Sequence, residues 1–367
     1  MNPVRILVDS FADEDSLNAQ MTNARDLMSR FDPERFQLTT FVVGTPDERL
    51  IRRPSTRLIP LPKRRQTIGI VKEFAWGRHD MLFYVKPSPA ARFYLAWRKK
   101  WFDRRPVIGT VESQSDLRNE PTIKPEQVRM WERTVLRSDF LFSNSSAVQA
   151  SLRKEYGRES QVIPTGVDTN FFTPAQEGPR ATRVRVLFVG ALRPFKGAQL
   201  LIRAAGLYPA VDFVIVGEGF MAAELESESK EKKLNNLTFL RGLKPPALRD
   251  EYRRADIFLF PSRWEGSPKV ILEAAACGLP VIARGDYQPE TVVNGETGLL
   301  GASNDELLDA LKNLVANQEL RRRMGAAGRA HSMRFDWDII ARQWEEVFLR
   351  LAQSRNTVDR DGVQPPA

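Results

Sequence analysis

The sequence predicts an α/β protein of two doubly wound, Rossmann-like domains whose parallel sheets face each other across a cleft. The chain has 367 residues, about two to three times the usual length of one domain. Short apolar runs alternate with helical patterns of about ten to fifteen residues, which is typical of parallel sheets covered on both faces. The alternation stops at a polar stretch containing Pro and Gly, 173–183, and then restarts.

In the N-terminal half, predicted strands and helices alternate from the first residues onward. An apolar run at 4–8 is followed by a helical pattern through Met21, Leu27 and Met28. The further elements expected here are strands at 36–43, 81–85, 106–111 and 140–142, and helices at 89–102, 125–137 and 147–156.

The C-terminal half repeats this pattern, which predicts an N-terminal domain at 1–172, a linker at 173–183 and a C-terminal domain at 184–336. A C-terminal helix is expected at 337–353, and whether this helix crosses back to the N-terminal domain is left open. A disordered tail is expected at 354–367, because that segment is polar and ends in Pro-Pro. The elements expected inside the second domain are strands at 184–189, 211–216, 237–240, 257–260 and 280–283, and helices at 198–207, 221–232, 247–254, from about 270, and 304–317.

Composition excludes several classes of protein. Hydrophobic residues at 42% and charged residues at 28% are typical of a folded soluble chain and not of a disordered one. The single Cys277 cannot form an internal disulfide, no secretory leader pattern opens the chain, and no run approaches about 18 apolar residues. A cytoplasmic location is expected, with peripheral contact on the inner face of the membrane left open.

The positive net charge indicates an anionic partner but does not show which kind. Lys and Arg exceed Asp and Glu by nine, which favours nucleic acid, anionic lipid or a phosphate-bearing substrate. No nucleic-acid-binding module is recognised, so no nucleic acid partner is expected. The basic segment 92–105 places Phe93, Trp97 and Trp101 at a spacing of four, and such a helix packs its aromatic side chains on the sheet or lies on anionic lipid.

The most informative segment runs from 260 to 280. An apolar strand ends at Pro261, and Ser267 followed by Pro268 predicts a helix with Ser267 as its N-cap. Gly278 predicts the end of that helix. Its free N-terminal amides would then lie beside the tips of the strands, which predicts an anion site.

Two carboxylates belong to this segment. Glu273 is the only charged residue of an otherwise apolar helix, so it is expected to be buried and to need hydrogen-bond donors. The hydroxyls of a ribose beside the anion site would serve, and Glu265 in the preceding loop can face the same pocket. The alternative is that Glu273 pairs with a structural cation and Glu265 is solvated.

A second strand, loop and helix, at 186–197, carries two cations. Arg193 and Lys196 at the carboxyl end of a strand can neutralise a leaving diphosphate, which is electrostatic catalysis. The alternative is a pair of ordinary surface cations.

From about Glu132 to Phe348 the chain resembles the retaining, nucleotide-sugar-dependent glycosyltransferases of the GT-B fold, group 4, also called the group 1 glycosyl transferase family. Glu265 and Glu273 match the E-x7-E pair of that family. The other motifs that carry the resemblance are the glycine-to-Lys-Gly loop at 190–197, the Val-Asp approach to the linker at 162–168, and the Asn-Gly-x-x-Gly turn at 294–300.

The resemblance implies transfer of a hexose-type sugar from a UDP- or GDP-sugar, bound by the C-terminal domain, to a saccharide or lipid-linked acceptor on the N-terminal side. It implies a role in polysaccharide or glycolipid biosynthesis, with no cofactor and no bound metal. Glu265 would hold the sugar, with Lys196 and Arg193 on the diphosphate. The residues it implies for donor binding are Glu273 at the ribose, with Gly266, Ser267, Lys269, Val270, Gly190, Gly217, Gly242 and Leu243.

Three departures from the family pattern keep other functions open. Ala191 stands where the family often has Arg, Glu112 stands where many members have His, and no Gly follows the first strand. The alternatives are a catalytically impaired partner subunit that binds a nucleotide sugar, and a nucleotide-sugar epimerase on the same scaffold. The segment 217–222 reads G-x-G-x-x-A without the acidic partner of a dinucleotide site, so it is assigned to the donor pocket.

Overall fold

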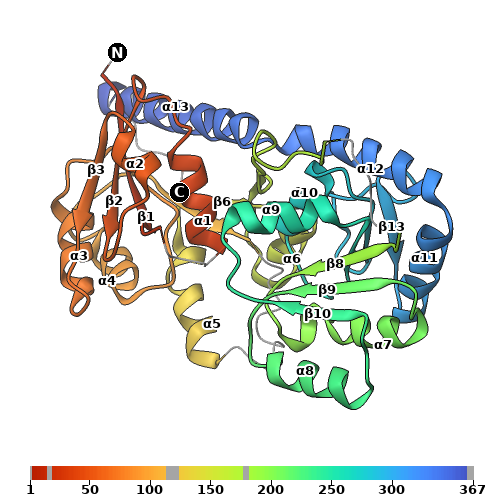
Figure 1. Ribbon diagram of the computed structural model, residues 1–367. Coiled ribbons are helices and arrows are strands. Elements are labelled where there is room, and N and C mark those ends of the chain that lie inside the picture. The colour runs from red at the N-terminus through yellow and green to blue at the C-terminus, as the bar shows by residue number, and fades with distance from the viewer. Residues whose placement is uncertain (1, 15–18, 113–123, 177–181, 362–367) are drawn as a thin grey trace. The chain divides into compact units, whose positions relative to one another are not determined.

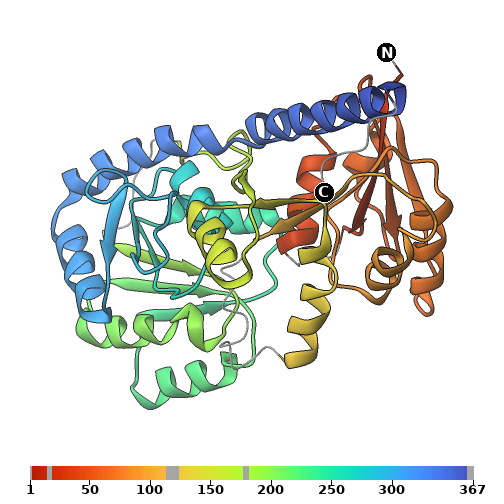
Figure 2. The same cartoon turned by 180° about the vertical axis from the view of Figure 1, so that it is seen from behind.

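The computed structural model describes residues 2–14, 19–112, 124–176 and 182–361. Contacts between Cα atoms group Met1–Pro164 with Trp337–Ala367 in one compact unit, unit 1, and Thr165–Asp336 in another, unit 2. Figures 1 and 2 show helices packed around a sheet in each unit. The linker at 173–183 and the domain bounds beside it stay predictions, which limited proteolysis would check.

Unit 1 is built on a parallel sheet of seven described strands in the order β3-β2-β1-β4-β5-β6-β7. The apolar run Ile6, Leu7 and Val8 of β1 is fully buried because β1 is central, paired with β2 on one side and β4 on the other. The strands are β1 Val4–Phe11, β2 Phe36–Val42, β3 Thr56–Pro60, β4 Met81–Phe83, β5 Val107–Val111, β6 Phe140–Ser143 and β7 Gln161–Val162.

The last helix, α13 (Trp337–Asp361), belongs to unit 1. Its Trp344 ring lies 4.7 Å from the Phe83 ring and 4.6 Å from the Phe142 ring, so aromatic packing holds it on the sheet. The tail expected to be disordered from 354 is helical as far as Asp361, because no Gly or Pro interrupts it before Gly362. The other helices are α1 Ala19–Met28, α2 Glu48–Arg52, α3 Gln66–Trp76, α4 Pro89–Trp97, α5 Pro125–Glu132 and α6 Ser146–Tyr156.

Two expected helices of unit 1 end early. The helix expected at 89–102 ends at Trp97, and tighter turns follow in which the Lys100 N–H donates to the Trp97 carbonyl. The helix expected at 125–137 breaks after Glu132, and a 3₁₀ turn follows at Val135–Arg137. The elements α2, β3 and α3, all between 43 and 81, were not expected.

Unit 2 is built on a parallel sheet of six described strands in the order β10-β9-β8-β11-β12-β13. The chain runs outward from β8 through β9 to β10 and then returns to β11 on the other side of β8. The carboxyl ends of β8 and β11 therefore flank the point where the winding reverses, which is where doubly wound sheets bind ligands. The strands are β8 Arg185–Val189, β9 Asp212–Val216, β10 Leu237–Leu240, β11 Ile257–Phe260, β12 Val281–Arg284 and β13 Gly298–Gly301.

Helix α12 of unit 2 was not expected, and it packs closely on the segment after α10. A Cβ atom on Gly325 would lie 2.0 Å from the carbonyl oxygen of Gly278, so only glycine permits this approach. None of the described helices combines the length and the apolar composition needed to cross a bilayer. The helices of unit 2 are α7 Gln199–Leu207, α8 Ala222–Glu231, α9 Pro245–Arg254, α10 Lys269–Ala276, α11 Asn304–Ala316 and α12 Gln318–Ser332.

Candidate active site

The loops that follow β8 and β11 are fixed against each other at the reversal point of unit 2. The Arg263 N–H donates to the Phe195 carbonyl at 2.9 Å, and the rings of Phe195 and Trp264 stack at 6.1 Å. Gly197 has a φ of 71°, and a Cβ atom there would lie 2.7 Å from the Pro261 carbonyl oxygen. Glycine is therefore required at 197 both for its backbone conformation and for space.

The loop after β9 packs on the loop after β8. A Cβ atom on Gly217 would lie 1.9 Å from the Gly190 carbonyl oxygen, and the Leu192 N–H donates to the Glu218 carbonyl at 2.8 Å. Gly242, with a φ of 61°, and the half-buried Leu243 follow β10 at the same edge. Three glycines that are predicted to bind the sugar donor thus follow three neighbouring strands: Gly190, Gly217 and Gly242.

Gly217→Ala is expected to lower the free energy of unfolding by about 1–3 kcal/mol, because the added methyl group overlaps backbone that must move. Gly206→Ala, inside α7, is the matched control. Its Cβ would make only ordinary contact, 3.8 Å from Leu234, so the change should stabilise the protein by about 0.5–1 kcal/mol. Urea unfolding of both variants checks this, and equal effects of the same sign would contradict the close approach of the two loops.

Lys196 and Glu265 form an ion pair between these loops. The Lys196 Nζ bonds Glu265 Oε1, and the Ser262 hydroxyl donates to the same oxygen at 2.5 Å. The side chains of Lys196 and Glu265 are only 17% and 13% exposed, so both charges are poorly hydrated. An ammonium and a carboxylate therefore stand together at the residues for which the resemblance implies contact with the diphosphate and the transferred sugar.

Helix α10 begins at Lys269, with Pro268 as its N-cap, so the prediction of Ser267 as N-cap is wrong. Pro268 takes the extended backbone conformation of a cap, and its own side chain makes no capping hydrogen bond. The N–H groups of a first turn lack partners within the helix and carry its positive dipole end. Ser267, Lys269 and Val270 lie at this terminus, half-buried, beside the buried Gly266.

Glu273, in the middle of α10, is buried as predicted, with 7% of its surface exposed. The Tyr252 hydroxyl, from α9, donates to Glu273 Oε2 at 2.9 Å. Burial, followed by the charge of Glu273, raises the pKa of Tyr252 well above its ordinary value. The same two causes raise the pKa of the nearby Cys277 thiol to about 12, so water screens the Glu273 carboxylate weakly.

Arg193 lies apart from the pair that its neighbour Lys196 forms. It precedes the 3₁₀ turn Pro194–Lys196 and is exposed, and its side chain has no ion pair with the residues that the structure describes. Its proposed place on the diphosphate remains a prediction.

The structure adds three hydroxyl groups that sequence reasoning missed. Tyr252 and Ser262 donate to the two glutamates. Tyr287, after β12, is fully buried, and its hydroxyl has no hydrogen-bond partner among the described residues. Burial and then the charges of Glu265 and Asp286 raise the pKa of Tyr287. Single hydroxyls carry no spacing signal, so no pattern in the sequence could have indicated them.

Unit 1 also gathers polar groups at the carboxyl ends of its strands. The Lys86 N–H donates to Asp9 at 2.9 Å, and the Lys86 ammonium lies 3.3 Å from the Ser10 hydroxyl. Glu112, after β5, accepts hydrogen bonds from the Tyr84 hydroxyl and, at 3.3 Å, from the Asn23 amide. Burial lowers the pKa of Lys86 to about 8.

Asp9 should make the stability of the protein fall as pH rises. Burial raises the pKa of its carboxyl from 3.8 to about 6, so the folded state binds the proton more tightly than the unfolded state. The stabilisation is complete below pH 3.8 and is lost as pH rises through about 6, by roughly 3 kcal/mol. Asp9→Asn removes this dependence. Thermal unfolding of both proteins from pH 4 to 7 checks it, and parallel curves would contradict it.

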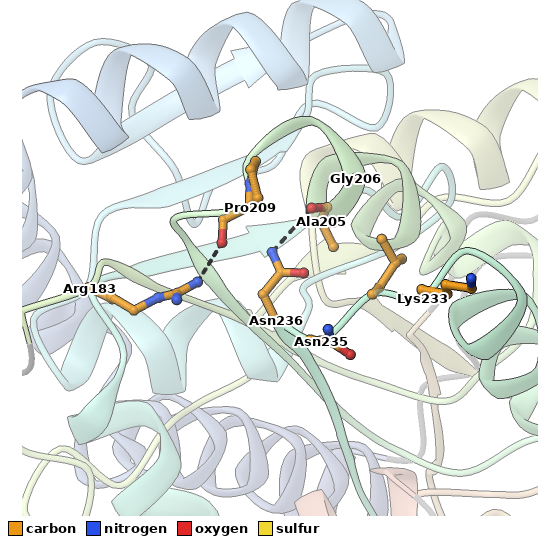
Figure 3. Close-up of a pocket in the computed structure, with 8 residues that line it drawn as sticks. Arg183, Ala205, Gly206, Pro209, Lys233, Asn235 and Asn236 are labelled. Carbon is orange, nitrogen blue, oxygen red and sulfur yellow. Dashed lines mark hydrogen bonds between the residues drawn. The ribbon is translucent and has the colours of Figure 1, made fainter.

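A surface hollow of unit 2 lies at the opposite edge of the sheet, before β8, β9 and β10 (Figure 3). The Arg183 guanidinium donates to the Pro209 carbonyl at 2.6 Å. The Asn236 amide nitrogen lies within 3.1 Å of three carbonyl oxygens, including that of Ala205. These polar groups form hydrogen bonds that connect neighbouring turns, so the hollow is not part of the candidate active site.

Comparisons with known proteins agree with this architecture. The model described as "Glycosyl transferases group 1" matches residues 170–331, and the one described as "Glycosyltransferase Family 4" matches residues 24–171. A D-inositol 3-phosphate glycosyltransferase of Corynebacterium jeikeium is 30% identical over 295 residues, which cover 72% of this chain and 70% of that protein.

Solved structures show the fold. A sucrose-phosphate synthase from Thermosynechococcus elongatus superposes with a TM-score of 0.80 at 21% identity, covering 96% of this chain and all of the other. Anabaena HepE in complex with UDP-glucose gives a TM-score of 0.74 at 19% identity, covering 94% and 99%. The predicted α/β class, with two doubly wound parallel sheets of the GT-B type, is confirmed.

Proposed function

Because this chain belongs to the group 1 and family 4 glycosyltransferases, we propose that it moves a hexose-type sugar from a nucleoside diphosphate sugar to a hydroxyl acceptor with retention of configuration. The observation that carries the proposal is the Lys196–Glu265 ion pair at the reversal point of the unit 2 sheet. The proposed pathway is polysaccharide or glycolipid biosynthesis, and the cytoplasmic location stays a prediction.

The donor would lie along the carboxyl edge of unit 2. Its diphosphate would face the Lys196 ammonium and the amides of Ser267, Lys269 and Val270, because anions are stabilised at a helix N-terminus. Glu273 would accept hydrogen bonds from the ribose hydroxyls. Glu265 would accept hydrogen bonds from the hydroxyls of the sugar once the Lys196 ammonium also contacts the diphosphate.

In the proposed reaction the bond between the anomeric carbon and the diphosphate oxygen breaks. The acceptor oxygen bonds to the anomeric carbon on the same face from which the diphosphate leaves. The acceptor proton passes to the leaving diphosphate, which Lys196 stabilises as its charge grows. No step in this scheme uses a metal ion.

We place the acceptor on unit 1, at the polar cluster formed by Lys86 and Glu112 with their partners Asp9 and Tyr84. Carboxylate and ammonium groups at strand ends suit the hydroxyls of a saccharide or the head of a lipid-linked acceptor. Glu112→Gln should then lower turnover with an acceptor while leaving donor binding unchanged.

The direct test incubates the protein with UDP- and GDP-sugars, with and without saccharide or lipid-linked acceptors, with EDTA in a parallel series. The expected result is acceptor-dependent release of nucleoside diphosphate that EDTA does not stop, with an α-linked product from an α-linked donor by NMR. Donor binding without release would indicate the impaired partner subunit. Conversion of the sugar without any acceptor would indicate the epimerase. A thermal-shift screen identifies the nucleobase of the donor, since a ligand at 100 times its Kd raises the free energy of unfolding by about 2.7 kcal/mol.

Tyr287→Phe tests whether the buried hydroxyl belongs to the donor site. The free protein should gain about 1 kcal/mol of stability, because an unpartnered buried hydroxyl is removed. Donor affinity should fall about two- to tenfold if the bound donor supplies the missing partner. Tyr208→Phe, at a half-buried tyrosine in unit 2, is the control. Calorimetry showing unchanged donor affinity would remove Tyr287 from the site.

A further inference from the structure

Six large apolar side chains of unit 1 are exposed between residues 68 and 102. The most exposed are Phe102 at 86%, Trp76 at 72% and Ile68 at 71%. Of the two interpretations of the aromatic residues of 92–105, burial against the sheet does not hold, because Phe93, Trp97 and Trp101 are 38–45% exposed. A cluster of this kind on a protein surface indicates an interaction site.

These side chains form two stripes that meet. Ile68, Lys72 and Trp76 are spaced by four on α3, so they share one face of that helix. Helix α4, which lies beside α3 in Figure 1, begins the second stripe at Phe93, whose ring lies 6.1 Å from the Trp97 ring and 6.0 Å from the Trp101 ring.

Trp101 joins the two stripes. Its ring stacks on the Trp76 ring at 6.0 Å, so α3, α4 and the turns at 98–104 present one continuous aromatic surface. We call the exposed side chains of α3, α4 and these turns the aromatic–basic surface.

The segment that carries this surface is strongly basic, although three of its cations, Lys86, Arg98 and Arg105, are not exposed. Residues 63–105 contain twelve Lys and Arg against three Asp and Glu, an excess of nine, which equals the net charge of the whole chain. The cations next to the aromatic side chains include Lys72, Arg78, Lys99, Lys100 and Arg104, and all five are exposed. The Lys100 ammonium lies 4.3 Å from the centre of the Trp97 ring.

The three acidic residues of this segment are held by partners within unit 1. Glu73 bonds His79 at 2.7 Å and Arg57 at 3.0 Å, and Asp80 bonds Arg5 at 2.7 Å. Asp103 bonds Arg105, and the Tyr94 hydroxyl donates to it at 2.6 Å. None of the three is among the exposed residues of 63–105, all of which the structure describes. The neighbouring carboxylate of Asp139, which is 42% exposed, pairs with the buried Arg98 at 2.8 Å and not with the exposed cations of the surface.

We propose that the aromatic–basic surface docks on the anionic headgroups of a lipid bilayer. Tryptophan is the side chain that favours the boundary between headgroups and acyl chains, and Lys and Arg bind anionic headgroups. Ile68, Phe102 and the indoles would enter that boundary while the surrounding cations stay at headgroup level. A second copy of the chain fits less well, because two such surfaces would bring like charges together. Single-stranded nucleic acid also fits less well, because Trp76 and Trp101 stack on each other.

The test measures flotation of the full-length protein with vesicles at 0.1 M salt. Vesicles of phosphatidylcholine with 30% phosphatidylglycerol should bind at least tenfold more protein than phosphatidylcholine alone. Lys99→Glu with Lys100→Glu should lower that binding at least tenfold, and Trp76→Ser with Phe102→Ser at least threefold. The matched controls, Arg322→Glu with Arg323→Glu on α12 and Leu207→Ser on α7, should change binding less than twofold.

A second measurement uses the unaltered protein. Lipids brominated in their acyl chains should quench its tryptophan fluorescence, and Trp76→Phe should reduce that quenching. Equal losses in surface and control variants would overturn the proposal. Gel filtration showing a dimer that Trp76→Ser dissociates would overturn it in favour of a second copy. Tighter binding to single-stranded RNA than to anionic vesicles would overturn it in favour of nucleic acid.

Discussion

Lys196→Ala is expected to lower kcat for sugar transfer by roughly 10²–10³-fold, the usual effect of removing one preorganised group that stabilises developing charge. Lys196 is 17% exposed and sits against the faces of Phe195 and Phe260, 5.3 Å from each ring centre. Its ammonium therefore acts in poorly hydrated surroundings, where a charge on the leaving diphosphate is stabilised more strongly than in water. Steady-state kinetics with a saturating acceptor measure the loss.

The controls separate this role from a general effect of charge. Lys312→Ala removes an exposed cation from α11 and should leave kcat within twofold. Ser262→Ala removes the neutral donor to the same Glu265 oxygen and should cost about tenfold or less. Arg193→Ala shows whether this exposed arginine shares the diphosphate. A Lys196→Ala enzyme that keeps kcat within threefold of the original would remove the ion pair from the mechanism.

The parts of the fold that the sequence predicted are the ones that hydrophobic patterns describe. The strands around 4–11, 185–189 and 257–260 are buried apolar runs, and each is present in the structure. The loop after Pro261 was predicted from the end of a strand followed by a Pro near a helix start, although the helix begins at Lys269, one residue later than predicted. The burial of Glu273 was predicted because its neighbours on α10 are apolar.

The elements that were missed lack such patterns. The buried residues of α12 include Gly325, Gly328 and Ser332, and small residues give no apolar periodicity although they allow close packing. Strand β13 is four residues long and begins and ends with glycine. Helix α3 buries only Ile70 and Phe74, and exposes apolar side chains that a pattern search assigns to the core. Tertiary contacts, and not local sequence, decide all three.

The ion pair between Lys196 and Glu265 was also beyond sequence reasoning, although both residues were predicted to belong to the site. They are 69 positions apart, and only the return of the chain from β10 to β11 beside β8 brings their loops together. Tyr252 reaches Glu273 for the same reason, from a helix 21 positions earlier. Motifs indicate which residues form a site, but the winding of the sheet determines which of them touch.

Glu273→Gln is expected to weaken donor binding about ten- to a hundredfold, because hydrogen bonds from the ribose hydroxyls to a charged carboxylate are worth roughly 1.5–3 kcal/mol. Glutamine is the informative change. It keeps the volume and can still accept the 2.9 Å hydrogen bond from Tyr252, so the fold of unit 2 should be preserved. Alanine would leave the buried Tyr252 hydroxyl unpartnered and confuse a loss of stability with a loss of affinity.

Tyr252→Phe completes the comparison, because it removes the hydroxyl that positions Glu273 while leaving the carboxylate charged. Calorimetric titration with nucleoside diphosphates that do or do not carry a ribose 2′-hydroxyl then locates the interaction. If Glu273 holds the ribose, Glu273→Gln should lose affinity for the ribose form and become nearly indifferent to the missing hydroxyl. Tyr252→Phe should retain that discrimination and lose only about three- to tenfold in affinity. Equal discrimination by the original protein and Glu273→Gln would show that the carboxylate serves the packing of α9 on α10 and not the donor.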